Sequence, residues 1–217
     1  MRKAILLAAC AAALSSCRGT IPQRDAPAEQ DIAAILIGSR FVLAGGETSE
    51  GLTHINLESE GGRNAEVYRL PIAGTGNFLY LLEPGIYHFA PTRSFFGSVE
   101  EEMTIRLDGR DHRIPFPREL LRQPPCTVRR SKILALGVLE ARLMPALPGQ
   151  KPQIRVSLDD TVEARRQLVQ ATIQEMMDPR RPAETRESAI SWSRALQNSL
   201  MEILSEQEKR PLFKPAP

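Results

Sequence analysis

The stretch Phe78-Leu79-Tyr80-Leu81-Leu82-Glu83-Pro84-Gly85-Ile86-Tyr87-His88-Phe89 carries the strongest fold signal in the chain. Two runs of apolar and aromatic residues, the types that favour strands, flank a Pro-Gly pair of the kind found in type II turns. We therefore expect residues 78–82 and 86–89 to be strands that pair as a β-hairpin.

Similar short runs lie on both sides of this stretch and are separated by Gly, Pro and Asp. Asp108-Gly109 is a further turn signal, because this dipeptide favours the tight turn of a hairpin. About eight strands at this spacing predict a mainly β fold, an antiparallel β-sandwich over residues 31–159. The other expected strands cover residues 32–43, 52–58, 67–72, 103–107, 133–144 and 154–158.

The hydrophobic period changes to a helical one at Asp160, which forms a predicted N-cap pair with Glu163. Asp178-Pro179 ends this helix, and a second begins after Pro182. We expect a C-terminal pair of helices over residues 160–205, followed by a disordered tail over 206–217. The second helix has an apolar stripe at Ala189, Trp192, Leu196, Leu200 and Ile203.

Two roles are open for the helix pair. In the first, the helices pack on the sandwich or against each other. In the second, Met176, Met177 and Trp192 form an exposed apolar stripe that binds a partner, because Met adapts to irregular surfaces and Trp is a frequent anchor.

The N-terminal segment has the composition of a targeting signal. Arg2 and Lys3 precede an apolar run over residues 4–14 that is too short to span a bilayer, and small residues follow it. Leu14-Ser15-Ser16-Cys17 resembles the processing site of bacterial lipoprotein signal peptides. The resemblance implies that residues 1–16 are removed and that Cys17 is acylated. An ordinary secretory signal cut nearby is the alternative.

The same resemblance implies an address in the bacterial cell envelope. Arg18 is not the aspartate that commonly retains such lipoproteins in the inner membrane, so the outer membrane is the favoured location. Residues 17–30 would be the lipidated N-terminus and a flexible tether, because 18–30 are polar and contain two prolines. Cys10 also follows a similar motif, but it leaves too short an apolar core before it.

Charge and composition narrow the possible partners. The chain has 28 basic and 26 acidic residues, and loss of Arg2 and Lys3 with the signal leaves equal numbers of each. Proteins that bind nucleic acid or anionic lipid surfaces usually carry a clustered excess of Lys and Arg. Because the charges here are balanced, neither is expected as the main partner. We expect contact with the membrane through the lipid on Cys17, and with an envelope protein.

The mature sequence shows no catalytic or cofactor signature. His54, His88 and His112 lack the close spacing of a metal site, and no Gly-x-Ser-x-Gly elbow is present. Cys126 is the one free thiol left after removal of residues 1–16 and acylation of Cys17, and an inert thiol is the expected role. We expect no cofactor, no metal and no enzymatic activity.

One predicted loop contains two adjacent aromatic residues, Phe95 and Phe96. An outward-facing ring there could anchor a protein partner or touch the membrane. In the alternative, one ring is tucked into the end of the sandwich.

Two segments resemble a known group of proteins. Tyr80 to Phe89 is similar to the leucine-proline-glycine-tyrosine hairpin of uncharacterised bacterial lipoproteins with transthyretin-like sandwiches, and Lys132 to Leu139 is similar to their later strand with a glycine at its middle. This resemblance implies the fold and an envelope location but no site residues. The sequence thus favours a binding or assembly component, an adaptor. The alternatives are a ligand-binding module and an unrecognised enzyme.

Overall fold

A computed structural model describes residues 33–43, 46–61, 66–92, 102–144, 153–180 and 182–209. The described residues confirm a mainly β fold with a C-terminal pair of helices, and they form twelve strands. In chain order the elements are β1 (Ala33–Leu43), β2 (Gly46–Thr48), β3 (Gly51–Leu52), β4 (His54–Ser59), β5 (Val67–Pro71), β6 (Gly76–Leu81), β7 (Gly85–Ala90), β8 (Glu102–Leu107), β9 (Arg110–Pro115), α2 (Arg118–Leu121), β10 (Cys126–Val128), β11 (Lys132–Met144), β12 (Gln153–Asp159), α3 (Val162–Met176), η1 (Ala183–Thr185) and α4 (Arg186–Lys209).

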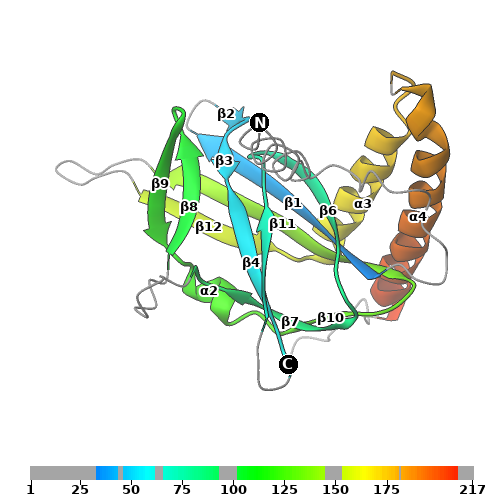
Figure 1. The fold of residues 1–217 in the computed structure, drawn as a ribbon, viewed down its shortest axis with the longest axis horizontal. Coiled ribbons are helices and arrows are strands. Elements are labelled where there is room, and N and C mark those ends of the chain that lie inside the picture. The colour runs from blue at the N-terminus through cyan, green and yellow to red at the C-terminus, as the bar shows by residue number, and fades with distance from the viewer. Residues whose placement is uncertain are drawn as a thin grey trace, which may run out of the picture.

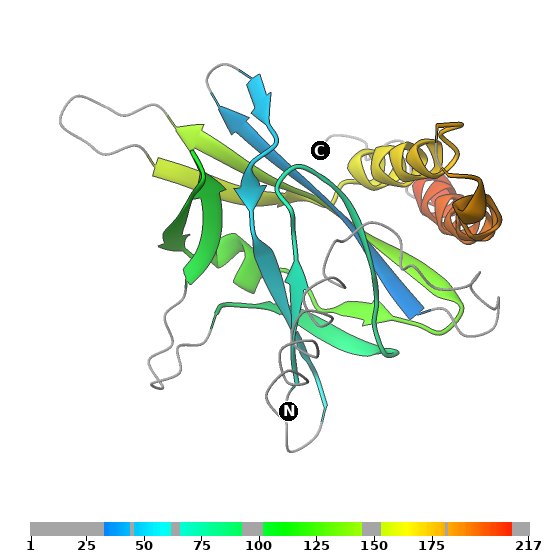
Figure 2. The same ribbon diagram turned by 45° about the horizontal axis from the view of Figure 1, so that its top comes forward.

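The described strands form three sheets (Figures 1 and 2). A five-stranded sheet has the order β12-β11-β1-β2, with β6 also paired to β1. A four-stranded sheet has the order β10-β7-β4-β5, and β3-β8-β9 form the third. The helices α3 and α4 lie side by side next to the five-stranded sheet, so this sheet has the sandwich core on one face and helices on the other.

The hairpin expected over residues 78–89 is not present, although both of its strands are. β6 pairs with β1, whereas β7 pairs with β4 and β10, so Glu83-Pro84-Gly85 is a corner that leads from one sheet to another. The hydroxyl of buried Tyr87 donates a hydrogen bond to the Glu83 carbonyl at 2.6 Å, as in the tyrosine corner of other sandwiches. The Pro-Gly pair sets a bend in the chain but does not choose the partner of each strand.

The Asp108-Gly109 turn is confirmed. It joins β8 to β9, which pair from Leu107↔Arg110 to Glu102↔Pro115. Asp108 and Gly109 have φ values of 52° and 71°, and two successive positive φ angles are what a type I′ turn requires.

The centre of the fold is a parallel pair, β1 with β11, which the expectation of an antiparallel sandwich did not include. β1 is buried on both faces over its first five residues. Ala34 and Leu36 belong to the helix-side core, and Ile35 and Ile37 belong to the sandwich core. A continuous apolar run of this kind is typical of a strand covered on both faces, the usual setting of parallel pairing.

Gly137 marks an irregularity in this pair, because the register of β1 against β11 shifts there. Its φ is 122°, and a Cβ built on it would lie 2.3 Å from the Asp159 carbonyl oxygen. The chain leaving β12 for α3 crosses directly against the backbone of β11 at this point. Only a residue without a side chain permits both the φ angle and the close approach.

The helices begin and end near the predicted positions, with two corrections. The N-cap of α3 is Thr161 and not Asp160, because the Thr161 hydroxyl accepts the Ala164 N–H at 3.2 Å. α4 continues to Lys209, so residues 206–209 of the expected tail are helical. The apolar stripe of α4 is buried against α3, β1, β6 and β11, and the helices therefore share a core with the five-stranded sheet.

We predict that Gly137→Ala lowers the free energy of unfolding by several kcal/mol, because it combines about 1–3 kcal/mol of backbone strain with a clash against backbone. Gly46→Ala is the matched control, since Gly46 also has a φ of 122° but no heavy atom within 4 Å of its added Cβ. Denaturant unfolding of both variants measures the difference. Equal losses would show that the crossing at Asp159 does not restrict residue 137.

We predict that Trp192→Ala destabilises the protein by about 3–5 kcal/mol, because the ring is 1% exposed in the helix-side core. Trp192→Phe should cost much less, since it keeps an aromatic ring and removes an indole N–H that has no partner in the described structure. Thermal and denaturant unfolding test both variants. If Trp192→Ala left the stability unchanged, the ring would not stabilise the helix-side core, and a role in binding a partner would be favoured.

Candidate functional site

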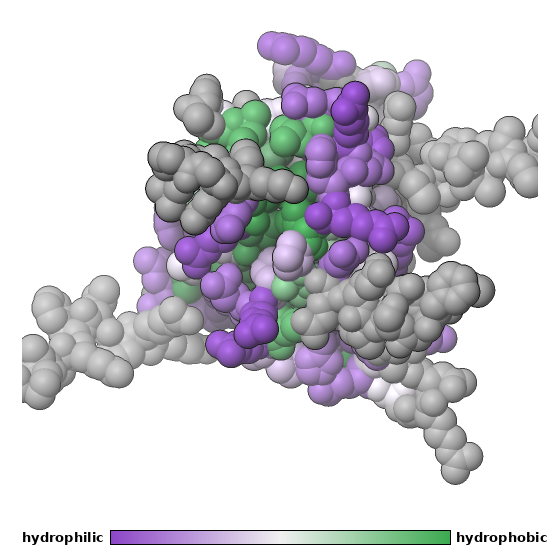
Figure 3. All heavy atoms as spheres, turned by 90° about the vertical axis from the view of Figure 1, so that its left-hand side faces the viewer, coloured by the Kyte–Doolittle hydropathy of each residue, from purple (hydrophilic) through white to green (hydrophobic). Residues whose placement is uncertain are grey.

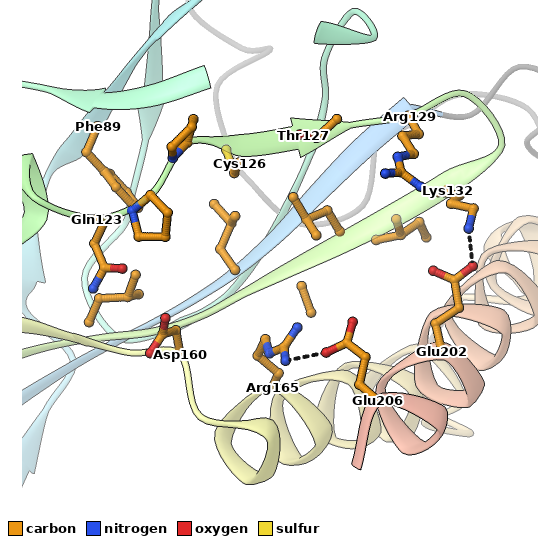
Figure 4. A pocket seen from close by; sticks show the side chains of 17 residues that line it. Phe89, Gln123, Cys126, Thr127, Arg129, Lys132, Asp160, Arg165, Glu202 and Glu206 are labelled. Carbon is orange, nitrogen blue, oxygen red and sulfur yellow. Dashed lines mark hydrogen bonds and ion pairs between the residues drawn. The ribbon is translucent and has the colours of Figure 1, made fainter. Parts of the chain in front are cut away.

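A cleft of about 460 Å³ lies between β10 and the helix pair (Figure 4). Its floor is the first part of β11, Ile133 to Leu136. One wall is mainly apolar, with Phe89, Pro125 and Cys126 beside the polar Gln123 and Thr127. The other wall carries charged residues of α3 and α4. The cleft therefore collects residues from six elements: β7, β10, β11, β12, α3 and α4.

The cleft exists because β12 covers only part of the edge of β11. β12 pairs with β11 from Met144↔Gln153 to Val138↔Asp159, and the chain then leaves for α3 at Gly137. Among the described residues, no strand pairs with Lys132 to Gly137 on the side opposite β1. β10 lies near this edge but belongs to the sheet of β7. The floor of the cleft thus includes an open strand edge.

The charged residues of the helical wall are paired. Lys132 of β11 binds Glu202 of α4, and Arg165 of α3 binds Glu206 at 2.7 Å. The Arg165 side chain is only 15% exposed, so its ion pair is shielded more than a surface pair. These contacts tie the two helices to each other and to the start of β11.

Two charged side chains of the cleft remain without an ion pair or hydrogen bond in the described part of the chain, Arg129 and Asp160. Figure 4 shows them at opposite ends of the cleft, with Arg129 beside Lys132 and Asp160 where β12 leads into α3. The cleft consequently has a positive end and a negative end.

Cys126 lies on the apolar wall with a half-buried thiol. Burial raises the pKa of this thiol, so it stays protonated at neutral pH. A protonated thiol is a poor nucleophile and a poor metal ligand. The cleft can therefore offer Cys126 as an apolar contact rather than as a reactive group.

His54 is the one buried histidine of the described residues and lies away from the cleft, on β4. Burial is the main cause of its lowered pKa, and the charge of Arg69 lowers it further. Its Nδ1 lies 2.9 Å from the Thr53 hydroxyl and 3.3 Å from the Arg69 guanidinium, and its Nε2 lies 3.3 Å from the Thr92 hydroxyl. A neutral ring held in this way is a structural part of the sheet.

The structure places the residues predicted as partner contacts as follows. Met176 and Trp192 are buried, so an exposed stripe containing them is wrong, while Met177 is 53% exposed. Cys17, Phe95 and Phe96 lie outside the described residues. Of the other histidines, His88 pairs with Glu60 and His112 is exposed on β9. No group of three potential metal ligands occurs in the described segments.

A second apolar surface lies at the β8–β9 end of the molecule, where Figure 3 shows hydrophobic side chains surrounded by hydrophilic ones. Partly exposed apolar residues of several strands extend the sandwich core to this end: Leu43, Leu107, Ile114, Leu143 and Ile154.

No family model and no curated protein matches this chain. Within the described ranges, neither α3 nor α4 nor any shorter helix has the length and hydropathy to cross a membrane.

We predict that the buried neutral His54 makes stability depend on pH. Because its pKa is lower in the folded than in the unfolded protein, its contribution is present above about pH 6.5, the unfolded value. It is lost as the pH falls towards the folded value, since the unfolded state then binds the proton more tightly. Denaturant unfolding between pH 7.5 and pH 5 should show a smaller loss for His54→Gln, which cannot titrate. Identical pH slopes for the two proteins would contradict this assignment.

Proposed function

We propose that the chain is a lipid-anchored protein of the bacterial envelope that acts as a binding or assembly component. The observation that carries this proposal is the sequence Leu14-Ser15-Ser16-Cys17 after a basic start and an apolar run. Two or more acyl chains anchor a protein stably, whereas one gives only marginal binding. The outer membrane is the proposed location, since residue 18 is Arg rather than Asp.

A binding role is supported by the state of the polar groups in the cleft. Lys132 and Arg165 are neutralised by Glu202 and Glu206, and the Cys126 thiol is protonated. Catalytic acids, bases and nucleophiles instead have pKa values tuned towards the operating pH. The cleft combines an apolar wall with a strand edge, which suits adhesion to a partner better than acid–base chemistry.

The alternative is a periplasmic or surface module for a small ligand. The cleft volume of about 460 Å³ favours it, because small-molecule sites commonly occupy 300–1,000 Å³. A small ligand would bind without requiring an extended backbone, which separates this alternative from an adaptor that holds a peptide.

We predict that cells fed an alkyne fatty acid label the parent chain and Cys10→Ala, and that Cys17→Ala abolishes the label and releases the protein from the membrane fraction. Cys10 is the matched control because it also follows a short apolar run. Gel fluorescence and membrane fractionation measure both effects. A parent chain that is unlabelled and soluble, or a Cys17→Ala variant that keeps its label, would refute lipidation at Cys17.

A further inference from the structure

We infer that the cleft binds an extended peptide of a partner protein, which adds to the open edge of β11 as an antiparallel strand with its carboxylate end at Arg129. This inference rests on the proposed binding function and names its partner class. It draws on three features of the cleft: the unpaired strand edge, the two unlike walls, and the unpaired charges at the two ends.

The open edge of β11 recognises backbone. An unpaired edge presents N–H and C=O groups that hydrogen-bond another extended chain, and many peptide-binding proteins use such an edge. Lys132 to Gly137 would accommodate about 20 Å of extended peptide. The Ile133 carbonyl of β11 already has a side-chain partner, because the Ser199 hydroxyl of α4 donates to it at 2.8 Å. This bond also fixes α4 beside the edge.

The walls select alternating side chains. Successive side chains of an added strand point to opposite faces of the sheet. On the helix-facing side, where Ile133 and Ala135 point, they would meet Arg165, Glu202 and Glu206. On the other side they would meet the apolar wall of Phe89, Pro125 and Cys126. The matching peptide alternates apolar and polar residues.

The unpaired charges set the direction of the peptide. Arg129 lies at the Lys132 end of the edge and Asp160 at the Gly137 end (Figure 4). An antiparallel strand would run from Asp160 towards Arg129, so its terminal or side-chain carboxylate would meet Arg129 and its amino end would meet Asp160. This is also the direction of β12, which pairs with the same edge as far as Val138.

The first test uses the full mature chain and a mixed library of ten-residue peptides with free carboxyl termini. We expect enrichment of peptides that alternate apolar and polar residues, followed by a loss of affinity of at least tenfold on Arg129→Glu. Arg130→Glu is the matched control, because Arg130 is a neighbouring exposed cation that does not line the cleft, and it should change affinity less than twofold. No enrichment, or equal effects of the two variants, would overturn the proposal.

The second test examines strand addition itself by N-methylation of each residue of an enriched peptide in turn. Methylation of every second residue should abolish binding, because those N–H groups face β11, and methylation of the others should have little effect. Loss without this alternation would overturn the strand model. Carboxyl amidation should weaken binding as Arg129→Glu does.

Other occupants of the edge give different results. If residues 210–217 of the same chain cover it, peptides bind only after truncation behind Lys209. If a second copy covers it, peptide affinity falls as the chain dimerises. Either result would overturn the proposal that a peptide of a partner protein binds this edge. These tests are independent of lipidation. If Cys17 were not labelled but peptides still bound with the alternating effect of N-methylation, the envelope proposal would be refuted and the peptide site in the cleft would remain supported.

Discussion

The parallel pairing of β1 with β11 is the constraint on which the rest of the structure depends. Both strands are buried on two faces, so each contributes alternate side chains to two separate cores. Ile35 and Leu139 join the sandwich core, while Leu36 and Ile133 join the core beneath α3 and α4. Because the strands lie about ninety residues apart in sequence, everything between them must close as one large loop before the pair can form.

The sequence predicts element positions better than element partners. The strands of residues 33–43, 67–71 and 132–144 and the two helices lie where hydrophobic periodicity places them, because local burial patterns reflect local structure. The pairing of β6 with β1, and of β7 with β4, depends on contacts distant in sequence. Pro84-Gly85 favours a bend in either arrangement, so turn chemistry alone could not separate a hairpin from a corner. The Asp108-Gly109 hairpin could be predicted because its turn type fixes the pairing.

The cleft could not be predicted from the sequence, because it arises where the pairing of β12 with β11 stops and not from a sequence motif. The edge of β11 is open where β12 turns away. The walls come from β7, from the segment that follows α2, and from the helices α3 and α4. The one local signal is Gly137, a glycine in the middle of an apolar strand, which often marks a bulge or a close backbone approach. Trp192 was instead predicted as a partner contact that the structure does not support. An aromatic residue on the apolar stripe of a helix is suited equally to a core and to a partner, and here it is buried.

An open strand edge is usually a hazard, because it can pair with any extended chain, and proteins commonly cover such edges or place charges beside them. Here the walls restrict access without covering the edge. α4 stands on one side, fixed through Lys132–Glu202 and Ser199–Ile133, and the apolar wall of β10 stands on the other. Any chain that pairs with this edge therefore has to fit between the two walls. The geometry that protects this edge from indiscriminate pairing is thus the same geometry that would make it selective for one peptide.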